Sequence, residues 1–242
     1  MAFRMIHLAE TTSTNSYLHQ LQGDDDVCVW ADHQTAGRGC GTNTWESEGG
    51  KNLLFSVRCH PEGVPATRQF LLLEAMALAV RQLFDCCDLG ERLTVKWPND
   101  IYWRDRKLAG TLSECMLSGQ HIRHCIIGTG LNLNQTEFRS DAPNPVSVAQ
   151  IRGTQMAVED TLLRLLHCFE KELQRIAQHR WDDIHSDYCH ALYRREGFHR
   201  YRDQAGTFSA AIKGVEPDGH LVLLDSDGLQ RRYAFKEVAF VL

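Results

Sequence analysis

The sequence predicts an α+β fold in which a mixed, mostly antiparallel sheet is flanked by helices and followed by a small C-terminal β-barrel. Short apolar runs at 27–31, 52–57 and within 93–134 have the length and composition of strands. Longer apolar or amphipathic runs at 65–89 and 158–178 indicate helices. After Gly197 the pattern changes to short alternating strands. We therefore expect a larger domain over residues 1–196 and a small β-barrel domain over residues 197–242.

The helices have recognisable limits. Residues 11–15 offer hydroxyl and amide side chains that can cap a short helix reaching about residue 22. The segment 65–89 is so apolar that a helix there must be buried on most sides, and Gly90 is its expected stop. Residues 158–178 predict an amphipathic helix, and residues 181–193 predict a second.

Turn residues separate the strands. The segments 93–97, 101–103, 107–116 and 121–134 are joined by turns, one of them at residues 98–100, and predict an antiparallel meander. The C-terminal strands at 206–212, 220–224 and 232–235 are separated by Pro-Asp-Gly and Asp-Gly turns. About 40 residues of this kind are too few to be stable without packing on the larger domain.

Composition excludes several classes of function. The chain has 242 residues, 43% of them hydrophobic and 24% charged, with a net charge of −5, which is typical of a globular protein. It has no block rich in lysine and arginine, so we do not expect it to bind DNA through a general basic face. The N-terminus lacks the apolar core of a signal peptide, and the most apolar segment, 70–80, is too short to cross a bilayer. We expect a cytoplasmic protein that does not bind membranes.

Cysteine and histidine give weaker signals. The nine cysteines are odd in number and form no Cys-x-x-Cys pair, so a disulfide framework is not expected. His121 and His124, near Cys125, come nearest to a metal-ligand cluster. Their strand context favours a solvated strand over a zinc site. No metal site is assigned from the sequence.

The most informative stretch is the glycine loop, residues 37–45, which has three glycines in five positions around Arg38. Glycine lets backbone N–H groups approach a ligand, and arginine adds a fixed cation with a planar fork of donors. The loop suits an anion, but it matches neither a dinucleotide fingerprint nor a Walker A loop. Taken alone, the loop is more typical of a glycine-rich surface hairpin.

Two further stretches favour a ligand-binding loop over a surface hairpin. Residues 96–100, Lys-Trp-Pro-Asn-Asp, place Lys96 at the end of a core strand, where it can point into a cleft or extend out to solvent. Residues 126–133 form a strand whose two glycines, Gly128 and Gly130, allow a bulky group against the backbone. A bulge in a core strand would use the same glycines.

Together these motifs resemble a biotin–protein ligase, that is, a biotin–[acetyl-CoA-carboxylase] ligase, of the monofunctional type. The resemblance runs in order through nearly the whole chain and is carried by residues 13–15, 34–39 with Trp45, 96–100, 106–110, 128–132 and 236–238. It implies a catalytic domain of the class II synthetase type and an SH3-like C-terminal barrel. Only about ten residues precede the first motif, so the N-terminal DNA-binding domain of bifunctional members is not expected.

The resemblance implies a reaction in two steps. The carboxylate of biotin attacks the α-phosphate of Mg·ATP to give biotinyl-5′-AMP and pyrophosphate, so Mg²⁺ is expected with ATP and biotin is a substrate. A lysine amine of a biotin carboxyl carrier protein domain then attacks the mixed anhydride and releases AMP. The chain itself could be a monomer or a homodimer.

The motif positions suggest a role for each residue. A carboxylate beside a triphosphate is repelled by about 4 kcal/mol per unit pair at an effective dielectric near 20, which Arg38 and Lys96 can offset as catalytic cations. The resemblance implies biotin binding by Ser13, Thr14, Asn15, Gln34, Gly37, Arg38, Gly39, Lys96, Gly128 and Gly130. It implies ATP binding by Arg38, Trp45, Asn99, Lys107 and Asn132.

The glycine loop departs from the family pattern at two positions. Where the family usually has arginine or glutamine and then glycine, this chain has Cys40 and Thr42. The retention of the adenylate is therefore in question, although the reaction type is not. Two other functions stay open on the sequence: a lipoate–protein ligase, which shares the fold and the adenylate strategy, and a sensor that binds biotinyl-AMP without transferring it.

Overall fold

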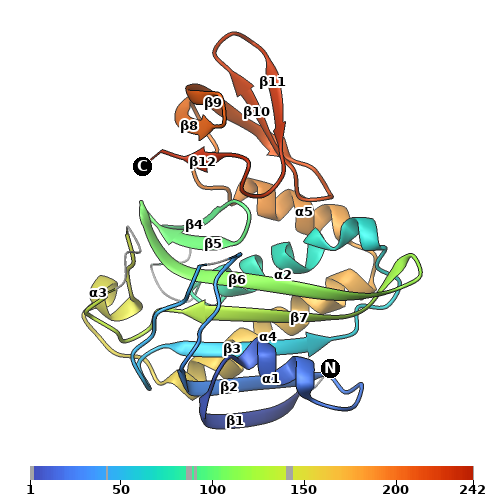
Figure 1. Ribbon diagram of the computed structural model, residues 1–242, viewed down its shortest axis with the longest axis vertical. Coiled ribbons are helices and arrows are strands. Elements are labelled where there is room, and N and C mark those ends of the chain that lie inside the picture. The colour runs from blue at the N-terminus through green and yellow to red at the C-terminus, as the bar shows by residue number, and fades with distance from the viewer. Residues whose placement is uncertain (1–2, 42, 86–88, 90–91, 140–143, 242) are drawn as a thin grey trace.

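The computed structural model describes residues 3–41, 43–85, 89, 92–139 and 144–241. Its main element is a seven-stranded sheet in the order β1-β2-β3-β7-β6-β5-β4 (Figure 1). The β1–β2 pair is parallel and the other pairs are antiparallel, as expected for a mixed, mostly antiparallel sheet. The strands are β1 (Arg4–Thr11), β2 (Val27–Gln34), β3 (Leu53–Cys59), β4 (Leu93–Lys96), β5 (Asp100–Trp103), β6 (Arg106–Ser118) and β7 (His121–Leu131).

Helices cover both faces of this sheet. The longer helices α2 (Phe70–Gln82), α4 (Val158–Ala177) and α5 (Trp181–His190) pack together on one face, and the short helix α1 (Thr14–Gln20) lies on the other (Figure 1). Side chains of β2 alternate accordingly: Cys28 joins the main core, whereas Val27 and Val29 pack against Leu18 of α1. The remaining helical segments are a 3-10 turn, Ala66–Arg68, and α3 (Val148–Arg152). Within the described residues, no helix combines the length and apolar character needed to cross a membrane.

Several element limits differ from the sequence expectation. The helix expected over 65–89 begins as the 3-10 turn, and α2 ends at Gln82, where Phe84 N–H donates to Arg81 O (3.0 Å) in a tighter turn. The expected stop at Gly90 lies outside the described residues. The helix expected over 181–193 ends at His190 because Tyr193 N–H donates to Val95 O of β4 at 2.9 Å. The first helix begins at Thr14, after the N-cap Ser13, and Thr11 instead ends β1, a strand that was not predicted from the sequence.

The C-terminal strands form a second, five-stranded sheet in the order β11-β10-β9-β8-β12. Its strands are β8 (His199–Asp203), β9 (Gly206–Val215), β10 (Leu221–Asp225), β11 (Gln230–Tyr233) and β12 (Ala239–Phe240), of which β8 and β12 were not anticipated. The described pairings leave this sheet open, so the expected SH3-like barrel is not confirmed. The C-terminal sheet packs against the larger one. Trp97 Nε1 donates to Gly219 O at 2.9 Å, and Trp97 contacts the ring of Phe235.

A buried ion pair joins α2 to α5. His185 Nδ1 lies 2.6 Å from Oε1 of Glu74, whose side chain is 2% exposed, and His185 Nε2 lies 3.7 Å from Cys189 Sγ. The hydrogen bond with Cys189 and the pair with Glu74 raise the pKa of His185 to about 10, against the opposing effect of burial. The protonated imidazole therefore stabilises the packing of α5 on α2.

Replacing His185 with alanine should lower the free energy of unfolding by about 3 kcal/mol, because the change leaves a buried carboxylate without its partner. The pKa is raised on folding, so the wild-type contribution is complete below pH 6.5 and is lost as the pH rises toward about 10. Urea denaturation at several pH values measures both effects. The Glu74→Gln variant should flatten the same pH dependence, and a His185→Ala profile parallel to wild type would contradict this account.

Candidate active site

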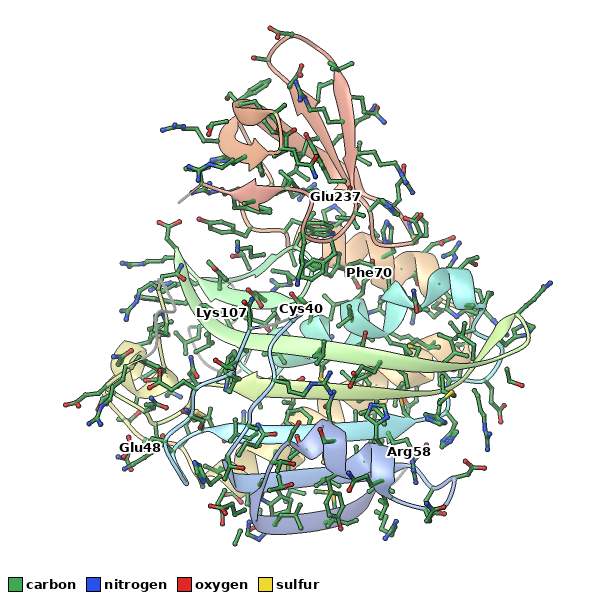
Figure 2. The ribbon with its side chains drawn as sticks, viewed as in Figure 1. Cys40, Glu48, Arg58, Phe70, Lys107 and Glu237 are labelled. Atoms are coloured by element: carbon green, nitrogen blue, oxygen red, sulfur yellow. The ribbon has the colours of Figure 1, made fainter. Side chains whose placement is uncertain are left out.

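A cavity of about 930 Å³ lies between the large sheet and the C-terminal sheet, where Cys40 and Lys107 are found (Figure 2). Every predicted site residue except Gly37 lines it: Ser13, Thr14, Asn15, Gln34, Arg38, Gly39, Trp45, Lys96, Asn99, Lys107, Gly128, Gly130 and Asn132. The C-terminal sheet adds Phe235, Lys236, Val238, Ala239 and Phe240. Segments that are far apart in sequence thus converge on one space.

A buried polar network lies at the start of α1. Gln34 Oε1 accepts from the backbone N–H of Thr14 at 2.7 Å and from its hydroxyl at 3.2 Å. The same hydroxyl lies 2.7 Å from Ser56 Oγ, which donates to Asn15 Oδ1 at 2.5 Å. Ser13, the N-cap residue, is buried, and its side chain makes no capping bond. The network fixes the orientation of several donors and acceptors at the cavity wall.

Glu114 connects this network to the glycine loop. Its carboxylate accepts from Asn15 Nδ2 at 2.9 Å and from Arg38 Nη2 at 3.0 Å, and it lies 3.1 Å from His19 Nε2. Burial raises the pKa of Glu114, but the hydrogen bonds from Asn15 and His19 and the charge of Arg38 outweigh it, so the net shift is downward. Glu114 was not predicted as a site residue, because its only signal in the sequence is a carboxylate inside a predicted strand.

The glycine loop, residues 37–45, is a narrow hairpin that pairs with itself. Gly39 N–H donates to Asn43 O at 2.8 Å, and Trp45 N–H donates to Gly37 O at 2.9 Å. A Cβ atom on Gly37 would lie 2.5 Å from Trp45 O, so the close pairing requires glycine there. Gly37 is buried but does not line the cavity, and Thr42 lies outside the described residues.

The glycines of β7 accommodate side chains of the protein itself. A Cβ atom on Gly130 would lie 2.4 Å from Trp45 Cε2, and one on Gly128 would lie 2.1 Å from Asn15 Oδ1. The bulky group that the sequence predicts against this strand is therefore the indole of Trp45. Its Nε1 is buried and has no hydrogen-bond partner among the described residues. Lys107 Nζ lies 5.5 Å from the centre of the indole ring.

The two lysines of the cavity differ in their pairing. Lys107 Nζ lies 2.7 Å from Asp100 Oδ1. Lys96, half-buried at the end of β4, has no ion pair within the described part of the chain, and its Nζ lies 5.2 Å and 5.4 Å from the ring centres of Tyr102 and Phe240. Burial is the main cause that lowers the pKa of Lys96, against the charge of Asp100. An anion entering the cavity would recover the electrostatic energy that this buried ammonium lacks.

Two asparagines hold the cavity wall with their amide groups. Asn99 Nδ2 donates to Thr111 O, and Asn132 Nδ2 donates to Val146 O at 3.2 Å. Asn132 Oδ1 is buried and has no partner among the described residues, although Asn132 lines the cavity. A ligand N–H group could satisfy this oxygen, because a buried acceptor without a partner is unfavourable.

Lys236 is a further cation that the sequence analysis did not place in the site. It adopts a left-handed backbone with φ of +72°, which is uncommon for a residue other than glycine. A Cβ atom on Gly41 would lie 1.7 Å from Lys236 Nζ, so the lysine stands directly against the glycine loop. Burial raises the pKa of the neighbouring Cys40 thiol, and the charge of Lys236 partly offsets that effect.

Comparison with known proteins assigns this chain to a family. A family model described as Biotin/lipoate A/B protein ligase family matches residues 5–132, and the chain belongs to this family. The bifunctional ligase/repressor BirA of Bacillus spizizenii is 29% identical over 97% of this chain and 73% of its own length. The biotin–[acetyl-CoA-carboxylase] ligase of Paracoccus denitrificans is 27% identical over 92% of this chain and 95% of its own.

Solved structures agree on the fold. The biotin protein ligase from Aquifex aeolicus in complex with biotin and ATP is 22% identical and superposes with a TM-score of 0.81, covering 98% of this chain and 97% of that one. The Leishmania major biotin protein ligase in complex with biotinyl-5-AMP superposes with a TM-score of 0.66 at 21% identity, covering 97% of this chain and 100% of that one.

Proposed function

We propose that this protein is a biotin–protein ligase, which activates biotin with Mg·ATP as biotinyl-5′-AMP and transfers the biotinyl group to a lysine of a biotin carboxyl carrier protein domain. The observation that carries the proposal is one cavity that joins the polar network of α1 to half-buried Lys96, which has no ion pair among the described residues. The polar network can recognise a neutral ring with hydrogen-bond donors and acceptors. Lys96 can bind the biotin carboxylate and the α-phosphate of ATP, the two anions that must meet in the first step.

Biotin recognition is assigned to the polar network. The ureido ring has both N–H donors and a carbonyl acceptor, which Ser13, Thr14, Asn15 and Gln34 can match from fixed positions. Because these groups are held by one another, a ligand without the ring would leave some of them unpaired on binding. The site should therefore discriminate strongly against plain fatty acids.

The adenylation step needs cations between two anions. Lys96 would lie between the biotin carboxylate and the α-phosphate, and Arg38 would join it after exchanging Glu114 for the ligand. A carboxylate and a phosphate oxygen a few Å apart repel by about 4 kcal/mol at an effective dielectric near 20, so two cations can remove a large part of the barrier. Glu114 holds Arg38 in place until an anion competes for it.

Nucleotide binding is assigned to the other side of the cavity. Asn132 Oδ1 could accept from the amino group of adenine, and the indole of Trp45 offers an aromatic face. We assign the phosphates to Asn99, Lys107 and Lys236, which line the same cavity. Mg²⁺ would arrive as part of the Mg·ATP substrate.

We propose further that residues 1–196 form the catalytic domain and that residues 197–242 form a small domain of SH3-like class that closes the cavity. The second sheet begins at His199, and its residues 235–240 contribute to the cavity wall. The adenylate hydrolyses if water reaches it, so a wall from this sheet and the glycine loop would protect the intermediate.

The first test is ATP–pyrophosphate exchange with biotin or lipoate as the acid substrate. We expect exchange that requires biotin, with lipoate inactive, because the polar network has no partner in the dithiolane ring of lipoate. Exchange driven by lipoate would instead identify a lipoate–protein ligase. Binding of biotinyl-AMP without its transfer to a carrier domain in a single turnover would identify a sensor.

The glycine loop should become protected when the substrates bind. It carries three glycines, and its described backbone hydrogen bonds are mostly within the loop itself, so few backbone bonds tie it to the rest of the protein before the substrates bind. Hydrogen exchange of the amides at 37–45 should slow when biotin and Mg·ATP are added. The amides of α4, remote from the cavity, serve as the internal reference. Equal exchange in both states would contradict a closing role.

A further inference from the structure

A second cluster of ligand-type side chains lies outside the cavity. Asp24 belongs to the segment between α1 and β2, His60 follows β3, and His124 is on β7. One nitrogen or oxygen atom of each lies within 4.8 Å of the corresponding atoms of the other two. Arg58, two residues before His60, lies at the end of the large sheet away from Lys107 (Figure 2). The cluster is therefore separate from the proposed ligase site.

The two imidazoles present unsatisfied nitrogens. His60 Nδ1 lies 2.8 Å from Asp26 Oδ1, so the other ring nitrogen, Nε2, is directed away from this carboxylate. His60 Nε2 and His124 Nδ1 are both buried and without a hydrogen-bond partner in the described chain. The ring centres are 5.7 Å apart. Buried nitrogens without partners are unfavourable, so a water molecule or an ion is expected between them.

The pairing of His60 with Asp26 is typical of a metal-binding histidine. A metal-binding histidine usually donates its other ring N–H to a carboxylate, which fixes the tautomer and makes the ligating nitrogen more basic. Asp26 occupies this position for His60, and Asp24 supplies an oxygen ligand.

Nearby arginines set a limit on the affinity. Arg123 Nη2 donates to the two oxygens of Asp24 at 3.2 Å and 3.0 Å, and Arg58 donates to the backbone carbonyls of Asp25 and Leu21. Asp24 and Asp26 balance these two positive charges. An ion would share Asp24 with Arg123, taking one carboxylate oxygen while the other stays with the guanidinium.

We propose that Asp24, His60 and His124 bind one divalent first-row transition cation, zinc foremost, through two imidazole nitrogens and one carboxylate oxygen. Zinc accepts this ligand set and leaves a fourth position for water. The side chains must rotate slightly, since zinc–ligand distances near 2.0–2.1 Å imply about 3.3 Å between ligand atoms. The ion would tie the segment after α1 to β3 and β7, so its expected effect is on stability.

The test uses the whole chain, freed of metal with a chelator and kept reduced because of its nine cysteines. Competition with a chromophoric chelator measures zinc binding, and thermal denaturation measures the rise in Tm with added zinc. We expect wild type to bind one ion that the His124→Gln variant loses, together with the Tm rise. The His121→Gln variant, changed at an exposed histidine of the same strand, should behave as wild type.

Two further measurements make the outcome decisive. The Asp24→Asn variant, changed at an exposed residue, should also lose the ion and guards against misfolding of His124→Gln. The absorption spectrum of the Co²⁺ form should lack a thiolate charge-transfer band. Zinc binding that survives both substitutions, that depends on His220 of the group Glu216, Asp218 and His220, or that wild type lacks would overturn the proposal.

Discussion

Replacing Lys96 with methionine should lower the rate of biotinyl-AMP formation about a hundredfold or more, with the fold intact. Methionine keeps an unbranched apolar stem but removes the ammonium, which lies over the rings of Tyr102 and Phe240. Loss of one preorganised charge at a reacting centre costs about 2.7–4 kcal/mol of barrier in comparable sites. Biotin-dependent ATP–pyrophosphate exchange measures this step alone.

The matched control for this change is Lys213→Met, at an exposed lysine of β9 that donates to Gln230. It removes the same charge far from the reacting groups and should leave exchange unchanged. If Lys96→Met kept near-normal exchange with a normal unfolding transition, the assignment of Lys96 as a catalytic residue would be wrong.

The second large effect concerns Lys236 and Cys40. In place of the arginine or glutamine that the resemblance implies in the glycine loop, this chain has Cys40, and Lys236 Nζ lies close to the adjacent Gly41. A charge-assisted hydrogen bond to a phosphate contributes about 1.5–3 kcal/mol, so Lys236→Met should release biotinyl-AMP about tenfold faster or more. Dissociation of radiolabelled adenylate measures the rate.

A double substitution shows whether an arginine at position 40 can compensate for the loss of Lys236, or whether the loss of Lys236 simply damages the site. Cys40→Arg alone should slow the release of biotinyl-AMP, and in the Lys236→Met background it should restore slow release, since either cation can reach the same phosphate. Lys213→Met again serves as the control. Release that is equally fast in Lys236→Met with and without Cys40→Arg would show that the loop retains the adenylate by other means.

The motifs could be predicted from the sequence because each is local. Lys96 follows an apolar strand and precedes a proline turn, so its place at the edge of a cleft depends on only a few neighbouring residues. The apolar character of α2 likewise predicts its burial. The edge strand β1 was missed because it is exposed along much of its length and shows no clean alternation.

The contacts that complete the cavity could not be predicted in this way. Glu114 meets Arg38 across 76 positions of sequence, and Lys236 meets Gly41 only because the C-terminal sheet packs over the glycine loop. The role of Gly130 also depends on a distant residue, since the space it leaves is filled by Trp45. Long-range packing decides these pairs, and one sequence carries no direct record of it.

The most direct test of the proposed function is the intact mass of a biotin carboxyl carrier domain after incubation with this protein, biotin and Mg·ATP. The account predicts that the carrier gains one biotinyl group on one lysine, and that omission of either biotin or ATP prevents the gain. Lys96→Met should abolish the gain on the same time scale, whereas Lys213→Met should not. A carrier whose mass stays unchanged under these conditions, while a known ligase modifies it, would contradict the account.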